Sequence, residues 1–347
     1  MNQFTIILIL LNLMMISLTG LFSLARFDLF YKQIFFWLVG FFLFFSCLFI
    51  DYRFIFEKYF FYLILVFSFL ILILVLFTSG YPKSWFNFFN FSFQPAEFSK
   101  IGFFLLLAYF LSHYQLDLIN PLYLVSSLIT ILPYLFLILF QPDWGMAFLY
   151  FLIWLLVVIS FLSKKEIIYF SLILILIFSF LWFFVLKDYQ KERILIFLNP
   201  SVDSLKSGYN LRQIKLSLAT SDFFGKGVGL GEIGRLGLLP SAPTDFILTF
   251  LIEERGFFIF IIYSLLIFLL LFEIFKAQKF HKNPLTKNFL FIVSQYFLAR
   301  YILTTLVNFG IFPIIGLPLP FLSYGGSHLI FDLWLLGILQ SLTKERI

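Results

Sequence analysis

Charged residues are scarce in this chain of 347 residues. Aspartate, glutamate, lysine and arginine together make up 12% of it, whereas a soluble domain contains about 25%. Hydrophobic residues make up 62%, and the mean hydropathy is +1.03. This composition excludes an ordinary soluble domain. Because many apolar runs approach the roughly 20 residues that a helix needs to cross a bilayer, the sequence predicts a polytopic membrane protein.

Cysteine and histidine are almost absent. The single Cys47 excludes an intrachain disulfide and a cysteine-ligated metal cluster. The three histidines show no metal-ligand spacing, so a zinc site is not expected. No small-residue cleavage site closely follows the first apolar run, and we expect that run to be a retained span that also serves as the insertion signal. The formal charge of +6 does not indicate nucleic-acid binding, because lysine and arginine of membrane proteins gather in cytoplasmic loops.

Hydropathy predicts an all-α membrane protein of about ten transmembrane helices, built as a single domain over 1–347. A large extracytoplasmic loop, about 187–244, is expected between the seventh and eighth helices. The span at 246–272 is interrupted at 253–256, as expected for a short interfacial or re-entrant helix followed by the true span. The ten spans are expected at 4–22, 33–50, 59–77, 96–112, 121–140, 145–162, 166–186, 246–272, 288–310 and 324–342.

The loops between these spans differ in basic charge. With a cytoplasmic N-terminus, the inside loops carry Arg53, Lys58, Lys164, Lys165, Lys276, Lys279, Lys282, Lys287, Lys344 and Arg346, and the short outside loops carry Arg26, Lys32 and Lys83. Lysine and arginine favour the cytoplasmic side. The sequence therefore predicts that both termini lie in the cytoplasm.

Four polar segments rich in proline or glycine interrupt the apolar sequence, at 93–97, 141–145, 239–245 and 316–327. Hydrocarbon tolerates such helix-breaking sequence only where it is buried in protein or lines a wet cavity. In the predicted topology all four fall on the outer side. We therefore expect them to form one polar cavity inside the helix bundle.

Several charged residues of these segments have both a structural and a functional interpretation. Glu97 and Lys100 share a helix face, either as an interfacial acid with a snorkelling lysine or as an ion pair facing the cavity. Asp143 either caps the next helix or faces the cavity. Asp245 opens an apolar helix beside the long loop. There it either stabilises the helix through a favourable interaction with the helix dipole or acts as a general base on a substrate hydroxyl.

The remaining polar features are less specific. The turn Ser323–Ser327 combines hydroxyls with Gly325 and Gly326, which permit close backbone approach. Arg300 and Asp332 lie within spans, where we expect them to pair and hold the bundle together. In the long loop, 209–219 is typical of an amphipathic surface helix. The glycine-rich stretch 224–231 could present backbone amides, and contact with a phosphate stays open.

Taken in order, these motifs resemble the SEDS family of bacterial cell-wall polymerases, the RodA, FtsW and SpoVE group, over nearly the whole chain. The stretches that carry the resemblance are Trp85, Phe93-Gln-Pro-Ala-Glu-Phe-Ser-Lys100, Gln141-Pro-Asp-Trp-Gly145, Leu198-Asn-Pro-Ser-Val-Asp203, Ser207-Gly-Tyr209, Phe224-Gly-Lys-Gly227, Leu239-Pro240, Thr244-Asp-Phe-Ile247 and the block 316–327. Each is weak alone, and the series is highly specific.

The resemblance implies a peptidoglycan glycosyltransferase that polymerises lipid II, a disaccharide pentapeptide linked to undecaprenyl pyrophosphate. It implies that Asp245 is the essential acid, that Glu97 and Lys100 line the cavity and that Asp143 is a second outer-facing acid. Further motif positions of less clear role are Trp85, Ser323, Tyr324, Gly325, Gly326 and Ser327. It also implies a class B penicillin-binding protein as partner, and a place in the bacterial inner membrane with the active site facing the periplasm.

In the mechanism that we expect, Asp245 takes the proton of the acceptor sugar's 4-hydroxyl, which attacks the anomeric carbon of the growing chain as pyrophosphate leaves. Lys215 of the outer loop, or a divalent cation, would stabilise the leaving diphosphate. No cofactor is assigned with certainty, and Mg²⁺ or Mn²⁺ stays open.

Within the family, Gln213-Ile-Lys215 and 224–227 are closer to RodA, the elongation enzyme, than to FtsW, the division enzyme. The chain departs from familiar relatives at 219–222 and 240–244, where glycines and an acid of the cavity mouth are missing. Three alternatives stay open: an FtsW-like septal polymerase, a lipid II flippase and a non-catalytic scaffold.

Overall fold

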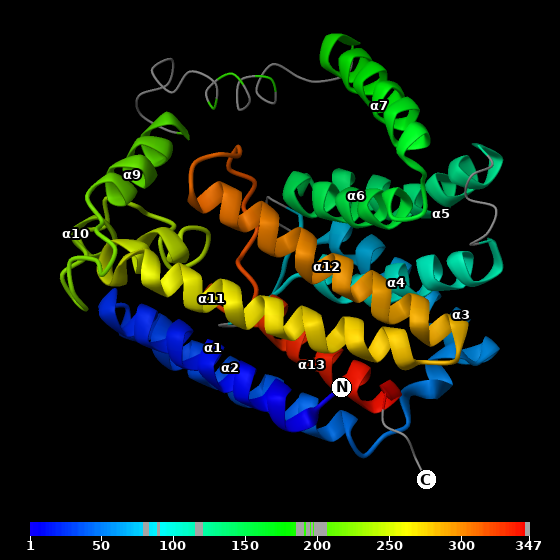
Figure 1. Ribbon diagram of the computed structural model, residues 1–347, viewed down its shortest axis with the longest axis horizontal. Coiled ribbons are helices and arrows are strands. Elements are labelled where there is room, and N and C mark those ends of the chain that lie inside the picture. The colour runs from blue at the N-terminus through cyan, green and yellow to red at the C-terminus, as the bar shows by residue number, and fades with distance from the viewer. Residues whose placement is uncertain are drawn as a thin grey trace.

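The computed structural model describes residues 1–78, 83–88, 91–114, 121–184, 191, 195, 197 and 207–343 (Figure 1). Long helices dominate the described part, as expected for an all-α membrane protein. They run from α1 (Gln3–Ser23), α2 (Phe27–Cys47), α3 (Lys58–Leu74), α4 (Pro95–Tyr114), α5 (Pro121–Phe140), α6 (Trp144–Ile159) and α7 (Lys164–Phe184) to α11 (Ile247–Phe280), α12 (Pro284–Asn308) and α13 (Gly326–Thr343).

Each of these helices overlaps one predicted span. By length and composition, six helices of the described residues are able to cross a membrane. They are α1, α2, α3 continued to Phe77, α4, α11 and α12. Shorter apolar helices cover Val125–Phe140 and Trp144–Ile159. The expected number of about ten crossings stays a prediction. The two largest differences from the expected boundaries are that α2 begins at Phe27 rather than at 33 and that α11 continues to Phe280 rather than to 272.

Short elements connect the long helices. They are η1 (Tyr52–Phe56), η2 (Val75–Phe77), the antiparallel strands β1 (Phe86–Phe88) and β2 (Phe91–Phe93), α9 (Ser207–Ala219) and α10 (Glu232–Arg235). The amphipathic helix predicted at 209–219 is α9, which packs against α11. Within the predicted loop 187–244, residues 187–190, 192–194, 196 and 198–206 lie outside the described residues.

Side-chain caps fix where several helices begin. Asn2 accepts hydrogen bonds from the first amides of α1, and Asn283 accepts one from Leu285 at the start of α12, where Pro284 occupies the first helical position. Both arrangements satisfy amides that have no partner within the helix. The polar residues at these positions therefore mark the helix starts in an otherwise apolar sequence.

The core of the bundle is formed by α4, α12 and α13. In the apolar stretches of α4 and α12 that could cross a membrane, 78% of the residues are buried. Helix α13 packs along α2 and also contacts α4. Small residues allow close approach between these helices. A Cβ atom at Gly40 of α2 would lie 2.2 Å from Leu333 of α13, and one at Gly102 of α4 would lie 2.3 Å from the Ser68 hydroxyl of α3.

A kink divides α11 at Gly256, where φ is 72°. The interruption predicted at 253–256 is therefore present, as a kink between two helical parts. The glycine-rich stretch folds over this kink. The Gly229 amide donates to the Glu254 carboxylate at 2.7 Å, and the amides of Lys226 and Gly227 donate to backbone carbonyls of the kink. These donors bind groups of the protein itself, which argues against the phosphate contact considered for this stretch.

The two ends of the described chain lie together. The Gln340 amide of α13 donates to the Met1 carbonyl at 3.1 Å, and residues 1–2 and 342–343 line one shared cavity of ≈ 460 Å³. In Figure 1 this end lies away from α9 and α10. This placement agrees with the prediction that both termini lie on the same side of the membrane.

Candidate active site

The four polar segments line one cavity of ≈ 500 Å³. Its walls come from Trp85 and Gln94, from 142–146 between α5 and α6, from Thr244 and Asp245 before α11, and from 315–318 and 324–328 around the start of α13. These segments are up to 244 residues apart in the sequence. The bundle therefore brings the helix breaks to one place.

Asp245 lies in the turn that precedes α11. Its amide donates to the Ser241 carbonyl at 3.0 Å, and its carbonyl accepts from the Asn308 amide at 2.8 Å. Burial raises the pKa of the Asp245 carboxyl to about 6, against the opposing hydrogen bond from Thr244. A carboxylate with a pKa near neutral pH, on the wall of a cavity, is suited to general-base chemistry.

The turn Ser323–Ser327 holds the Asp245 segment in place. The Ser323 hydroxyl donates to the Thr244 carbonyl, and the Tyr324 amide donates to the Pro243 carbonyl at 2.8 Å. The sequence indicated only a turn rich in hydroxyls, and neither of these two contacts could be recognised from it. The structure thus places the turn directly beside Asp245.

Gln33 of α2 also binds the turn Ser323–Ser327. Its side-chain amide donates to the Ser323 carbonyl at 3.1 Å and accepts from the Gly325 amide at 3.2 Å. The side chain is fully buried. Sequence reasoning missed Gln33, because a single glutamine in an apolar helix carries no motif.

Asp143 caps α6 and lines the cavity at once, so both interpretations of this residue hold. One carboxylate oxygen accepts from the Met146 amide at 3.0 Å, and the other accepts from the Gln94 side chain at 2.5 Å. Burial raises the pKa of the Asp143 carboxyl. The backbone amide of Gln94 donates to the Ser327 hydroxyl at 3.1 Å, which joins the start of α4 to α13.

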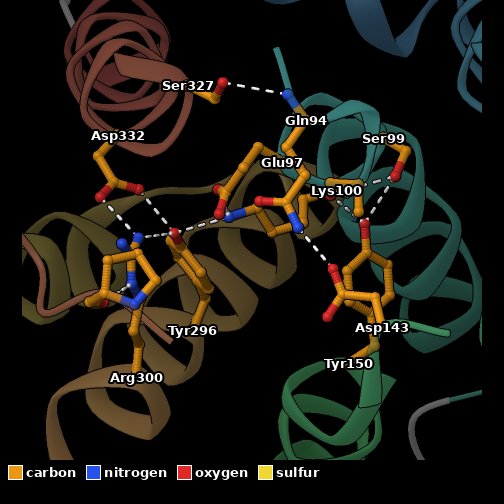
Figure 2. Close-up of polar contacts among 12 residues, drawn as sticks. Gln94, Glu97, Ser99, Lys100, Asp143, Tyr150, Tyr296, Arg300, Ser327 and Asp332 are labelled. Carbon is orange, nitrogen blue, oxygen red and sulfur yellow. Dashed lines mark hydrogen bonds and ion pairs between the residues drawn. The ribbon is translucent and has the colours of Figure 1, made fainter. Parts of the chain in front are cut away.

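Glu97 and Lys100 form a buried ion pair on α4, as Figure 2 shows. They are absent from the residues that line the cavity. Lys100 also donates to the Tyr296 hydroxyl at 2.8 Å, and that hydroxyl donates to Asp332 at 2.6 Å. The pair thus belongs to a buried network, and its expected place in the cavity lining stays a prediction.

Arg300 and Asp332 complete this network. Their side chains lie 2.8 Å apart, which confirms the predicted pair, and Arg300 also donates to the Tyr296 hydroxyl at 2.6 Å. Two cations and two carboxylates balance each other around one phenol, and buried charges require such pairing. The Arg300 Nε atom donates to the Pro318 carbonyl at 2.8 Å. Because Pro318 lines the cavity, the network supports the cavity wall.

Lys215 is not brought to this cavity. It lies on α9 and lines a separate, more open cavity of ≈ 630 Å³ together with Tyr209 and Arg212. Trp85, in contrast, lines the cavity of Asp245 and is 38% exposed. Among the described residues that line that cavity, Asp143 and Asp245 are charged and there is no lysine or arginine.

A preformed metal centre is not visible in the described part of the chain, where no group of three or more histidine, cysteine, aspartate or glutamate side chains could hold an ion. Asp143 and Asp245 nevertheless offer carboxylates to the cavity. Magnesium is commonly held by one or two carboxylates together with substrate phosphates and water. The residues therefore fit a cation that arrives with a phosphate-bearing ligand.

Comparison with known proteins agrees with these motifs. The family model FTSW_RODA_SPOVE, described as a cell cycle protein, matches residues 1–347. The chain belongs to the FtsW, RodA and SpoVE family. This assignment confirms the resemblance to SEDS proteins, and with the apolar helices it makes the chain a multi-pass membrane protein.

Relatives named for both branches of the family are similar to the chain. A probable peptidoglycan glycosyltransferase FtsW from Wigglesworthia glossinidia brevipalpis is 36% identical over 247 residues, which cover 69% of this chain and 64% of the relative. The peptidoglycan glycosyltransferase MrdB of Escherichia coli K12 is 32% identical over 264 residues, which cover 73% and 69%. The match to the first of these relatives thus spans less than two thirds of its length.

Solved structures share the fold. A chain of a structure titled "Structural coordination of polymerization and crosslinking by a peptidoglycan synthase complex" has a TM-score of 0.83 and 26% identity, over 98% of this chain and 97% of that one. Thermus thermophilus RodA, the rod shape determining protein, has a TM-score of 0.70 and 23% identity, over 97% and 95%. The second likeness concerns the fold alone.

Proposed function

We propose that this chain is a peptidoglycan glycosyltransferase that polymerises lipid II, with Asp245 as the general base. The observation that carries the proposal is the position of Asp245, a half-buried carboxylate on the wall of the cavity that all four polar segments form. The proposal is supported by family membership and by relatives named peptidoglycan glycosyltransferases.

In the proposed reaction, Asp245 accepts the proton of the 4-hydroxyl of the acceptor sugar. The hydroxyl oxygen then forms a bond to the anomeric carbon of the growing chain, and the bond from that carbon to the diphosphate breaks. The products are a new glycosidic bond and undecaprenyl diphosphate, and the proton stays on Asp245 until water removes it. A base with a pKa of about 6 is ionised at neutral pH and can accept this proton.

The leaving diphosphate carries negative charge into a cavity whose described lining offers two carboxylates and no lysine or arginine. A divalent cation, Mg²⁺ or Mn²⁺, would neutralise this charge when bound, and Asp143 is the residue that would hold it beside the diphosphate. Asp143 is already oriented by Gln94 and by the Met146 amide. Lys215 remains a candidate only for a diphosphate located nearer α9.

For the cellular role we propose elongation, as in RodA, on the basis of 213–215 and 224–227. Septal synthesis, as in FtsW, is the second candidate, and it is favoured by the similarity to FtsW relatives. A class B penicillin-binding protein is the proposed partner, supported by the similarity to a complex titled for both polymerisation and crosslinking. The proposed site faces the outer side of the bacterial inner membrane, with both termini inside.

The test is polymerisation of labelled lipid II by purified protein, with and without the transpeptidase partner. Asp245→Asn should abolish the polymer seen on a gel, because the amide cannot accept the proton. Asp28→Asn is a matched control, since Asp28 is an exposed carboxylate outside the cavity. Near-normal polymer from Asp245→Asn would refute the assignment. Lipid scrambling without polymer from the wild type would favour the flippase alternative.

A further inference from the structure

His328 is a buried histidine at the cavity that the proposed mechanism does not use. It lies in the first turn of α13, lines the cavity and is 5% exposed. Neither of its ring nitrogens has a hydrogen-bond partner. The Tyr324 carbonyl, four residues earlier, lies near the ring but outside hydrogen-bond geometry.

Three neighbouring polar side chains of the cavity have partners within the protein. Ser327 accepts from the Gln94 amide and donates to the Ser92 carbonyl at 3.2 Å. Gln94 and Asp143 bind each other. A buried polar group without a partner costs about 1–3 kcal/mol, and native structures retain few of them without a functional reason. The unsatisfied imidazole therefore stands out in this wall.

Gly325 leaves room for the ring of His328. A Cβ atom at Gly325 would lie 2.6 Å from both Cδ2 and Nε2 of the ring, so the absent side chain creates the space for the imidazole.

A neutral imidazole offers one N–H donor and one acceptor nitrogen. A diphosphate can only accept hydrogen bonds, so it would satisfy one of the two. A sugar hydroxyl or an N-acetyl amide both donates and accepts, and the cavity also carries Trp85 and two carboxylates. The chemistry of the wall therefore matches a sugar ring better than a phosphate.

We propose that His328 hydrogen-bonds a hydroxyl or acetamido group of a substrate sugar in this cavity and thereby positions that sugar beside Asp245. This inference rests on the proposed function and adds a substrate-binding residue to it.

Two substitutions test the contact in the lipid II polymerisation assay. His328→Phe fills the same space without hydrogen bonds, and we expect kcat/KM to fall about tenfold or more. His328→Gln keeps one donor and one acceptor, and it should recover most of the loss. His113→Phe is the control, because His113 is exposed at the end of α4, away from the cavity.

Thermal denaturation in detergent separates binding from folding. Because the imidazole has no partner to lose, His328→Phe should melt at the wild-type temperature or above it. A lower melting temperature with a parallel loss of activity would overturn the proposal, since the ring would then have a structural role. Unchanged kcat/KM in His328→Phe would overturn it as well.

Direct binding of labelled lipid II to the same proteins keeps the two proposals distinguishable. If the wild type binds lipid II but makes no polymer, the proposed reaction fails, and weaker binding by His328→Phe still supports the contact. If the wild type polymerises lipid II and His328→Phe binds and polymerises it equally well, the contact alone is refuted.

Discussion

At the scale of single residues, two carboxylates of the cavity differ in their freedom to react. Both oxygens of Asp143 accept hydrogen bonds, one from the Met146 amide and one from Gln94. Among the interactions that act on the pKa of Asp245, the only hydrogen bond comes from its neighbour Thr244. A carboxylate with fewer fixed donors is the better proton acceptor. Asp245 is therefore suited to be the base and Asp143 to have a positioning role.

The raised pKa of Asp245 predicts a pH dependence. The base must be ionised, so kcat/KM of lipid II polymerisation should be constant above about pH 6 and fall about tenfold per pH unit below it. Initial rates measured between pH 4.5 and 8 would show this fall in kcat/KM at acidic pH. Melting temperatures over the same range serve as the control for acid unfolding. A fall near pH 4, the ordinary range of aspartate, would contradict the role of burial at this site.

Much of the site at this scale was accessible from the sequence, because Asp143, Asp245 and the Ser323–Ser327 turn stand in helix-breaking segments. Tyr296, Gln33 and His328 were not predicted. Tyr296 and Gln33 are single polar groups inside apolar helices, where no periodicity or spacing marks them. Their contacts join α4 to α12 and α13, or α2 to the turn. Such contacts depend on how helices pack, which a pattern along one helix does not contain.

At the scale of elements, the kink of α11 and the loop 223–231 depend on each other. Glu253 accepts from the Lys226 ammonium at 2.8 Å and from the amides of Glu232 and Ile233. The backbone must turn at Gly256 to bring these groups together. Hydropathy predicted the interruption because charged residues stood in an apolar span. It could not predict that the charges bind the loop.

We predict that Gly256→Ala destabilises the protein by several kcal/mol. Its φ of 72° disfavours a side chain, and a Cβ atom would lie 2.0 Å from the Phe223 carbonyl oxygen. Gly237→Ala is the matched control, since Gly237 has a φ of 73° but no atom within 4 Å of the added Cβ. Thermal melting should show a small loss for Gly237→Ala and a large one for Gly256→Ala. Equal losses would mean that the contact with Phe223 has no role.

At the scale of the whole molecule, the cavity exists because the helices bring four distant segments to one place. Hydropathy located the helices, and the rule that polar backbone avoids lipid led to the expectation of one cavity. The same reasoning did not indicate that Glu97 and Lys100 join a buried network, or that Lys215 lines a separate cavity on α9. Motifs fix which segments meet, whereas packing decides which side chains face the space between them.

The orientation of the whole molecule gives the last prediction. Phe224 lies beside the α11 kink and is 74% exposed, whereas Phe280 lines the cavity shared by the chain ends and is 73% exposed. Cysteine introduced at either position is thus equally accessible within the protein. The native Cys47 is buried and should not react.

In intact spheroplasts, a maleimide that cannot cross membranes should label Phe224→Cys and leave Phe280→Cys unlabelled. Permeabilised cells provide the control in which both variants react, and the unsubstituted chain sets the background. This outcome follows from the basic residues near the chain ends, which favour the cytoplasm. Labelling of Phe280→Cys alone would show that the protein has the opposite orientation in the membrane. It would also place the cavity of Asp245 on the side opposite to that required for synthesis outside the cell.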